Sequence, residues 1–78
     1  MTLPLSAFSA RVAVSSSNLR SVAYDGWTGT LEVEFCSGGI YQHYNVPYSL
    51  YDGLMHAGSK GSYYYYNLRN RYGCTRIN

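Results

Sequence analysis

Hydrophobic and polar residues alternate along residues 30–36, and this is the clearest pattern in the chain. One side of the segment carries Leu31, Val33 and Phe35, and the other carries Thr30, Glu32 and Glu34. A period of two is typical of a half-buried β-strand. Weaker alternation over residues 11–15, 19–25 and 40–46 predicts further strands, separated by segments rich in Gly, Asp and Ser. Short turns between consecutive strands predict an antiparallel meander of three to four strands.

The pattern changes to a helical period after Pro47. Apolar residues recur at helical spacing up to residue 57, and Gly58 is typical of a helix end. A second helix is predicted over residues 63–71, with Tyr64 and Leu68 facing the sheet and with Tyr65, Tyr66 and Arg69 on its outer side. The tail at residues 73–78 is predicted to be loose. The predicted fold class is therefore α+β, with two C-terminal helices packed on one face of the meander.

The length of 78 residues predicts a single domain over residues 11–78, preceded by a loose leader at residues 1–10. The leader has no basic segment followed by a long apolar run, so we do not expect a signal peptide. No stretch approaches the length of a transmembrane helix, so we expect a cytoplasmic protein without a membrane partner. Hydrophobic residues make up 46% and charged residues 13%, which leaves an aromatic, neutral surface suited to a partner or a second copy.

Positive charge is concentrated in the last quarter of the chain. Residues 1–59 are mildly acidic, whereas residues 60–78 contain only basic charged residues, namely Lys60, Arg69, Arg71 and Arg76. Tyrosines lie between them, at positions 63, 65, 66 and 72. Basic side chains for phosphates and aromatic rings for bases are the combination that holds single-stranded nucleic acids. The alternative is that the tyrosines pack in the core and its rim while the arginines are simply solvated.

Residues 58–62, with the sequence Gly-Ser-Lys-Gly-Ser, precede the second predicted helix. Free backbone N–H groups at a helix start, beside a lysine, can hold an anion. The alternative is a helix–helix turn in which a serine caps the helix. Together with the basic and aromatic residues, this segment completes a candidate set for binding RNA or a nucleotide: Lys60, Gly61, Ser62, Tyr63, Tyr65, Tyr66, Arg69, Arg71 and Arg76.

Neither catalysis nor a metal or cofactor is predicted. His43 and His56 have no second ligand at a suitable spacing, and Cys36 and Cys74 form no C-x-x-C motif, so we expect two reduced thiols. Glu32 and its neighbour Glu34 are expected on a solvated strand face. No serine or cysteine lies in a nucleophile motif such as G-x-S-x-G. These observations exclude the enzyme classes that such motifs identify, and they favour a binding module.

The order of residues resembles the KTSC domain, which is named for the C-terminal region of some lysyl-tRNA synthetases and also occurs as a small separate protein in bacteria and their phages. The resemblance covers roughly residues 11–73 and rests on Val14, Ser16, Ser17, Asn18, Leu19, Val22, Tyr24, Asp25, Thr30, Leu31, Glu32, Val33, Glu34, Phe35, a glycine at 38 or 39, Tyr41, Val46, Pro47, Tyr51, Leu54, Ala57, Ser59, Gly61, Tyr63, Tyr64, Asn67, Leu68, Arg69 and Tyr72. It implies RNA binding, by analogy with the synthetase attachment. Tyr64 and Tyr65 replace the family's usual phenylalanine and asparagine, which makes this copy more aromatic.

Three hypotheses about function follow. The first is an RNA-binding module that uses the C-terminal aromatic and basic residues. The second is a small bacterial or phage protein that binds or sequesters a nucleotide signal, favoured by the small size and the glycine-rich helix start. The third is a protein–protein adaptor, such as an inhibitor of a host system, which uses its aromatic surface and forms a homo-oligomer.

Overall fold

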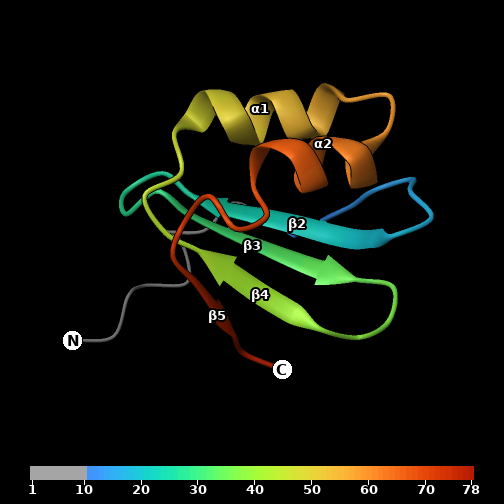
Figure 1. Cartoon of the computed structure of the whole chain (residues 1–78), viewed down its shortest axis with the longest axis horizontal. Helices are drawn as coiled ribbons and strands as arrows, with labels where there is room; N and C mark the ends of the chain where they lie inside the picture. Colours follow the sequence, from blue (N-terminus) through green and yellow to red (C-terminus); the bar gives the residue numbers. More distant parts are fainter. Residues whose placement is uncertain (1–10) are drawn as a thin grey trace.

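One antiparallel sheet with two helices on one face forms the structure. The computed structural model describes residues 11–78, so the predicted leader lies outside the described residues. The elements are β1 (Val12–Ala13), β2 (Leu19–Asp25), β3 (Thr30–Phe35), β4 (Ile40–His43), α1 (Tyr48–His56), α2 (Lys60–Asn67) and β5 (Cys74–Arg76). The five strands lie in the order β1-β2-β3-β4-β5, and Figure 1 shows both helices on the same side of the sheet. The α+β prediction is confirmed.

A bulge in β2 decides which of its residues face the helices. The register shifts between Leu19 and Ser21, so that Leu19 pairs with Phe35 while Val22 pairs with Val33. Without the shift, a strand of period two would place residues 19 and 22 on opposite faces. With the shift, both side chains lie in the core.

The core lies between this sheet face and the helices. It is formed by Leu19, Val22, Tyr24, Leu31, Val33, Val46, Leu54 and Leu68. Tyr24 also donates a hydrogen bond from its hydroxyl to the carbonyl oxygen of Val46, at 2.6 Å, which ties β2 to the segment before α1. From α1, Leu54 is fully buried, and Leu50, Tyr51 and Met55 pack against the core as the helical period predicts.

The second helix begins and ends earlier than predicted. It spans Lys60–Asn67 instead of residues 63–71, because Ser59 caps it by accepting a hydrogen bond from the backbone N–H of Ser62. Asn70, in the left-handed region with φ of 61°, lies beyond its end. The helix is also held against α1 by a glycine, since a Cβ at Gly53 would collide with the Tyr63 side chain.

The C-terminal tail is a strand, which corrects the prediction of a loose segment. β5 pairs antiparallel with β4, with Cys74 opposite His43 and Arg76 opposite Tyr41. Strand partners directly opposite one another point to the same face, so Cys74 and Arg76 face the helix side. β4 in turn ends at His43 instead of at residue 46, because Asn45 takes a left-handed conformation with φ of 58°.

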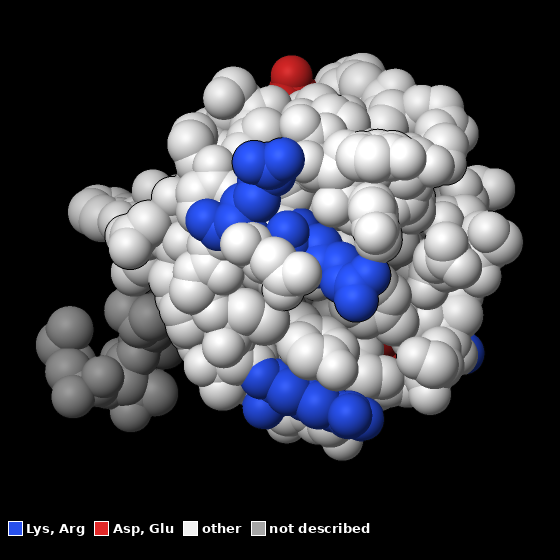
Figure 2. All heavy atoms as spheres, in the orientation of Figure 1, with Lys and Arg blue, Asp and Glu red and all other residues white. Residues whose placement is uncertain are grey.

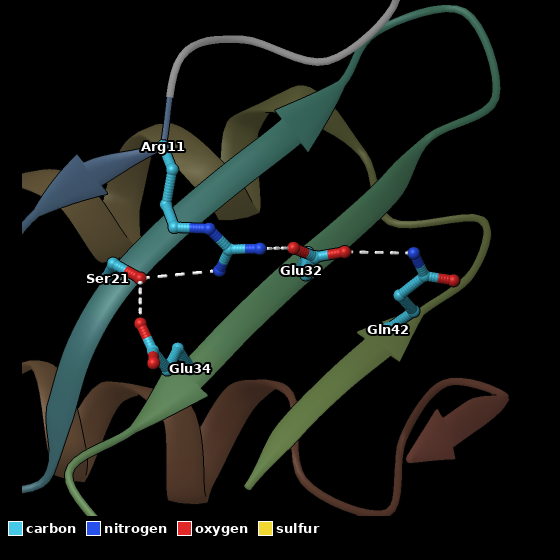
Figure 3. Close-up of polar contacts among 5 residues, drawn as sticks. All are labelled: Arg11, Ser21, Glu32, Glu34 and Gln42. Carbon is cyan, nitrogen blue, oxygen red and sulfur yellow. Dashed lines mark hydrogen bonds and ion pairs between the residues drawn. The ribbon is translucent and has the colours of Figure 1, made fainter. Parts of the chain in front are cut away.

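The structure corrects the prediction that Glu32 and Glu34 of β3 lie on a solvated strand face. Figure 3 shows Glu32 and Glu34 on the sheet face away from the helices, in a polar network that joins β2, β3 and β4 to Arg11, the residue before β1. Glu32 is only 8% exposed, forms an ion pair with Arg11, and accepts a hydrogen bond from Gln42 Nε2 at 3.0 Å. Glu34 accepts a hydrogen bond from Ser21 Oγ at 2.7 Å. The neighbouring strands therefore supply partners that the alternation in β3 alone does not reveal.

Candidate functional site

A cleft with a volume of about 680 Å³ opens between the sheet and α2. Its lining comes from the loop before β2, from the β3–β4 turn, from β4 and from the segment that joins α2 to β5. This volume lies in the range of about 300–1,000 Å³ that is typical of small-molecule sites. Its lining is largely aromatic and is contributed by Phe35, Tyr41, Tyr64, Tyr65 and Tyr72.

Phe35 is central to the aromatic wall of the cleft. Its ring meets those of Tyr41 and Tyr64 edge to face, at centroid distances of 5.6 and 5.1 Å. Edge-to-face contacts fix the orientation of neighbouring rings. The wall is therefore built from residues of β3, β4 and α2 that hold one another in place.

The rim of the cleft carries a stacked arginine and tyrosine. The Arg69 guanidinium lies over the Tyr65 ring, 5.1 Å from its centroid, and Tyr65 is 55% exposed. Tyr66, which is 68% exposed, meets Tyr65 edge to face at 5.2 Å. The structure records no acidic partner for Arg69 within residues 11–78, and no acidic residue is part of the cleft lining. The rim thus combines the exposed rings of Tyr65 and Tyr66, on the outer side of α2 where the helical period predicted them, with the positive charge of Arg69. Arg69 was predicted on the same side of the helix but lies just beyond its end.

The other predicted basic residues lie outside the lining. Lys60 donates from Nζ to the carbonyl oxygen of Ala57 at 3.0 Å, which satisfies the end of α1. Arg71 donates from Nε to the carbonyl oxygen of Tyr66 at 2.9 Å. Arg76, on β5, has its guanidinium 5.7 Å from the ring centroid of the lining residue Tyr41. Figure 2 shows the face of the molecule that carries the α2–β5 connection. Basic side chains lie over this connection and near β5, and few acidic atoms are visible on this face.

The predicted residues at the start of α2 divide between the cleft and the helix interface. Gly61 lines the cleft, and a Cβ there would lie 2.5 Å from the side-chain amide nitrogen of Asn18, so that amide would have to move. Ser62 is engaged in the cap with Ser59. Tyr63 packs against the core and lies beside Gly53 of α1. Of the predicted set, the structure therefore brings together Gly61, Tyr65 and Arg69 in the lining of the cleft.

Sequence reasoning missed His43, which lines the cleft although it is only 1% exposed. Its Nε2 atom lies 2.8 Å from the Tyr64 hydroxyl and 4.0 Å from Cys74 Sγ. Burial lowers the pKa of His43 below its usual value of 6.5, so its ring is neutral at pH 7. Alternation along residues 40–46 did place Tyr41 and His43 on one face, but it did not say that this face lies under α2.

Two further groups that line the cleft, the Tyr64 phenol and the Cys74 thiol, also have pKa values that favour the uncharged form. Burial, and then the neighbouring Cys74 and Tyr41, raise the pKa of Tyr64 to about 12. Burial raises the pKa of the Cys74 thiol. Both Cys36 and Cys74 line the cleft, and both are free thiols.

The described residues bring no three His, Cys, Asp or Glu side chains together in a way that could hold a metal ion. No helix in this part of the chain has both the length and the apolar character needed to cross a membrane.

Comparison with known proteins identifies the family. The family model described as the KTSC domain matches residues 15–72. The chain belongs to the KTSC domain family. The crystal structure of a KTSC domain protein from Yersinia pestis superimposes with a TM-score of 0.87 at 33% sequence identity, covering 92% of this chain and all of that one.

Other relatives of this KTSC chain differ greatly in length. An uncharacterized protein of Stutzerimonas stutzeri (strain A1501) is 44% identical over 54 residues, which is 69% of this chain and 76% of that protein. The lysine–tRNA ligase of Trichormus variabilis (strain ATCC 29413 / PCC 7937) is 32% identical over 54 residues, which is only 10% of its length. The resemblance to the KTSC family noted from the sequence is thus confirmed. The family match includes α1, α2 and most of the cleft, whereas Arg11, Cys74 and Arg76 lie outside it.

Proposed function

We propose that this KTSC protein binds RNA, and that single-stranded segments enter the cleft past the rim formed by Tyr65 and Arg69. The observation that carries the proposal is the guanidinium of Arg69 stacked 5.1 Å above an exposed tyrosine ring, with no acidic partner among the described residues. A planar cation can contact a phosphate bidentately, and an exposed ring offers a stacking surface to a base. Proteins hold unpaired nucleotides by these two contacts, a cation on the phosphate and an aromatic ring against the base.

Two further observations support RNA as the ligand. Within the described part of the chain, the lining of the cleft contains five aromatic residues and no acid, which favours an anionic ligand with planar groups. Proteins that share this region are named lysine–tRNA ligases, and the name connects those whole proteins, of which the shared region is about 10%, with tRNA. We therefore expect both single-stranded RNA and tRNA to bind.

We propose binding without catalysis, and the state of the cleft's polar groups supports this. The raised pKa values of Cys74 and Tyr64 keep a thiol and a phenol protonated near neutral pH, when a nucleophile would need to be ionised. Protonated groups of this kind serve as hydrogen-bond donors. A module that binds bacterial or phage RNA in this way would act in the cytoplasm.

Fluorescence anisotropy with a labelled single-stranded RNA and with tRNA tests the proposal. Titrations at about 50 mM and about 200 mM NaCl should give a weaker affinity at the higher salt, because phosphate contacts release counterions. Tyr65→Ala should weaken binding by about 1–3 kcal/mol, which is the usual loss for one stacked base. Arg69→Ala should reduce the slope of log K against log salt by about 0.7.

Matched variants separate a specific site from a generally sticky surface. Trp27→Ala removes the side chain that is 88% exposed in the β2–β3 turn, at the opposite end of β3 from the β3–β4 turn, and should leave RNA affinity unchanged. Arg69→Lys keeps the charge but loses the planar stack, so its affinity should lie between those of the wild type and Arg69→Ala. Lack of binding of either RNA at both salt concentrations would rule out the proposal.

A free nucleotide is the second candidate ligand, and the volume of the cleft favours it. About 680 Å³ suits one nucleotide, and most of the lining residues lie within the family match. A thermal-shift panel of mono-, di- and cyclic nucleotides tests this alternative, since a ligand of the folded state alone raises the melting temperature. A shift with one nucleotide, combined with no binding of RNA, would select this function over the first. The mass of the protein in solution, measured with and without ligand, would report whether it self-associates.

A further inference from the structure

The floor of the cleft contains a buried histidine whose two ring nitrogens have different surroundings. His43 points from β4 toward α2, and its Nε2 lies 2.8 Å from the Tyr64 hydroxyl. The other nitrogen, Nδ1, is buried without a hydrogen-bond partner in the described part of the chain. The two rings meet edge to face with centroids 5.3 Å apart, so the contact has a fixed geometry.

This difference determines where the single proton of the neutral ring lies. A buried N–H without an acceptor is rarer in proteins than a buried lone pair without a donor. The proton therefore belongs on Nε2, and Nδ1 carries the unpaired lone pair. Nε2–H then donates to the oxygen of Tyr64, with Cys74 Sγ as a second, more distant acceptor at 4.0 Å.

With its oxygen acting as an acceptor, Tyr64 keeps its own hydroxyl hydrogen for another partner. Among the described residues, the structure records no hydrogen bond of this hydroxyl except the one to His43. The hydroxyl also stays protonated, because the pKa of Tyr64 is raised to about 12. Tyr64 lines the cleft, and it therefore offers a hydrogen-bond donor to whatever enters.

We propose that the cleft receives one nucleotide of the bound RNA and that Tyr64, oriented by His43, donates its hydroxyl hydrogen to an acceptor oxygen of that nucleotide. This inference rests on the proposed function. The acceptor comes from a base carbonyl or from a phosphate, which are the strongest oxygen acceptors of a nucleotide. Arg69 lies at the rim of the same cleft, so the phosphate of the same or the adjacent nucleotide can be held there.

Replacing Tyr64 by phenylalanine isolates the hydroxyl. Tyr64→Phe keeps the ring and its contacts with Phe35 and His43, and removes only the donor. We expect about a tenfold weaker affinity for RNA, the usual effect of losing one hydrogen bond to a ligand. Tyr48→Phe, on α1 at a 62% exposed residue outside the cleft lining, is the matched control and should bind as the wild type does.

Homopolymers about eight nucleotides long distinguish the two sources of the oxygen. If the acceptor is a base carbonyl, Tyr64→Phe should weaken binding of oligo(U) and oligo(C) and leave oligo(A) unchanged, because adenine has no carbonyl. If it is a phosphate, all three should weaken equally. Equal affinities of Tyr64→Phe and wild type for every oligomer would overturn the inference while leaving the proposed function intact. A wild type that binds no RNA would overturn both.

A test of the His43 proton position by NMR requires neither RNA nor a folded variant. The ¹⁵N chemical shifts of the His43 ring in the free protein report which nitrogen carries the proton. We expect the Nε2–H form near neutral pH. The Nδ1–H form would mean that Tyr64 donates to His43 instead, and would overturn the inference whatever the binding data show.

Discussion

On the sheet face away from the helices, the carboxylates of Glu32 and Glu34 have hydrogen-bonding or ionic partners, whereas on the cleft side Arg69 has no acidic partner among residues 11–78. Glu32 is paired with Arg11 and with Gln42. Arg69 instead lies against a tyrosine ring. A charged side chain that forms its hydrogen bonds within the sheet contributes to the fold. A charged side chain without such partners can still bind a ligand. The distribution of partners around charged side chains, more than the net charge of +2, therefore indicates a binding surface.

The largest expected effect comes from the core between the sheet and the two helices. Leu68→Ala should lower the free energy of unfolding by about 2–5 kcal/mol, because Leu68 is fully buried and anchors the C-terminal end of α2. Denaturant titration measures this loss. Tyr66→Ala on the same helix should change the free energy by less than about 0.5 kcal/mol. A loss below about 1 kcal/mol for Leu68→Ala would show that the cleft wall does not depend on this anchor.

Arginines on the two sides should respond in opposite ways. Arg11→Ala leaves Glu32 buried without its ionic partner, so we expect a loss of about 1–2 kcal/mol of stability and no change in RNA affinity. Arg69→Ala should leave stability within about 0.5 kcal/mol and weaken RNA binding. Both variants are measured by denaturant titration and by anisotropy. If they lose stability and affinity in equal measure, the contrast between the two sides is wrong.

The pH dependence of stability should reveal the buried histidine on the cleft side. The pKa of His43 is lowered in the folded state, so below about pH 6.5 the unfolded chain takes up a proton that the folded protein does not. The free energy of unfolding should therefore fall as the pH decreases below that value, by at most about 1.4 kcal/mol per pH unit for this group.

The difference between wild type and His43→Gln isolates this contribution, because the carboxylates titrate in both proteins. Denaturant titrations from neutral to mildly acidic pH give the two curves. Parallel curves would mean that His43 takes up its proton equally in the folded and unfolded states, and that it is not held neutral in the cleft.

The smallest expected effect concerns an exposed aromatic residue far from the cleft. Trp27→Ala should change stability by less than about 0.5 kcal/mol, because Trp27 is 88% exposed. RNA affinity should also stay the same, in contrast to Tyr65→Ala at the rim. A marked loss of affinity in Trp27→Ala would extend the binding surface to the β2–β3 turn.

The sequence by itself determined the elements whose pattern is local. Alternation along residues 30–35 identified β3, and the helical spacing of Leu50, Leu54 and their neighbours identified α1. The pairing of Tyr64 with Leu68 was also enough to say which side of α2 is exposed. These features depend on residues within one or two turns of each other, so a linear pattern contains them. The family, too, was recognised from ordered positions along the chain.

Only the tertiary structure decided how distant segments meet. β5 is short, and its three residues form a strand because β4 offers an edge to it, more than thirty positions earlier in the chain. The cleft, the contact of His43 with Tyr64, and the ion pair that buries Glu32 all arise in the same way. Each joins side chains from different elements, and their contact depends on strand order and register, which no local period encodes.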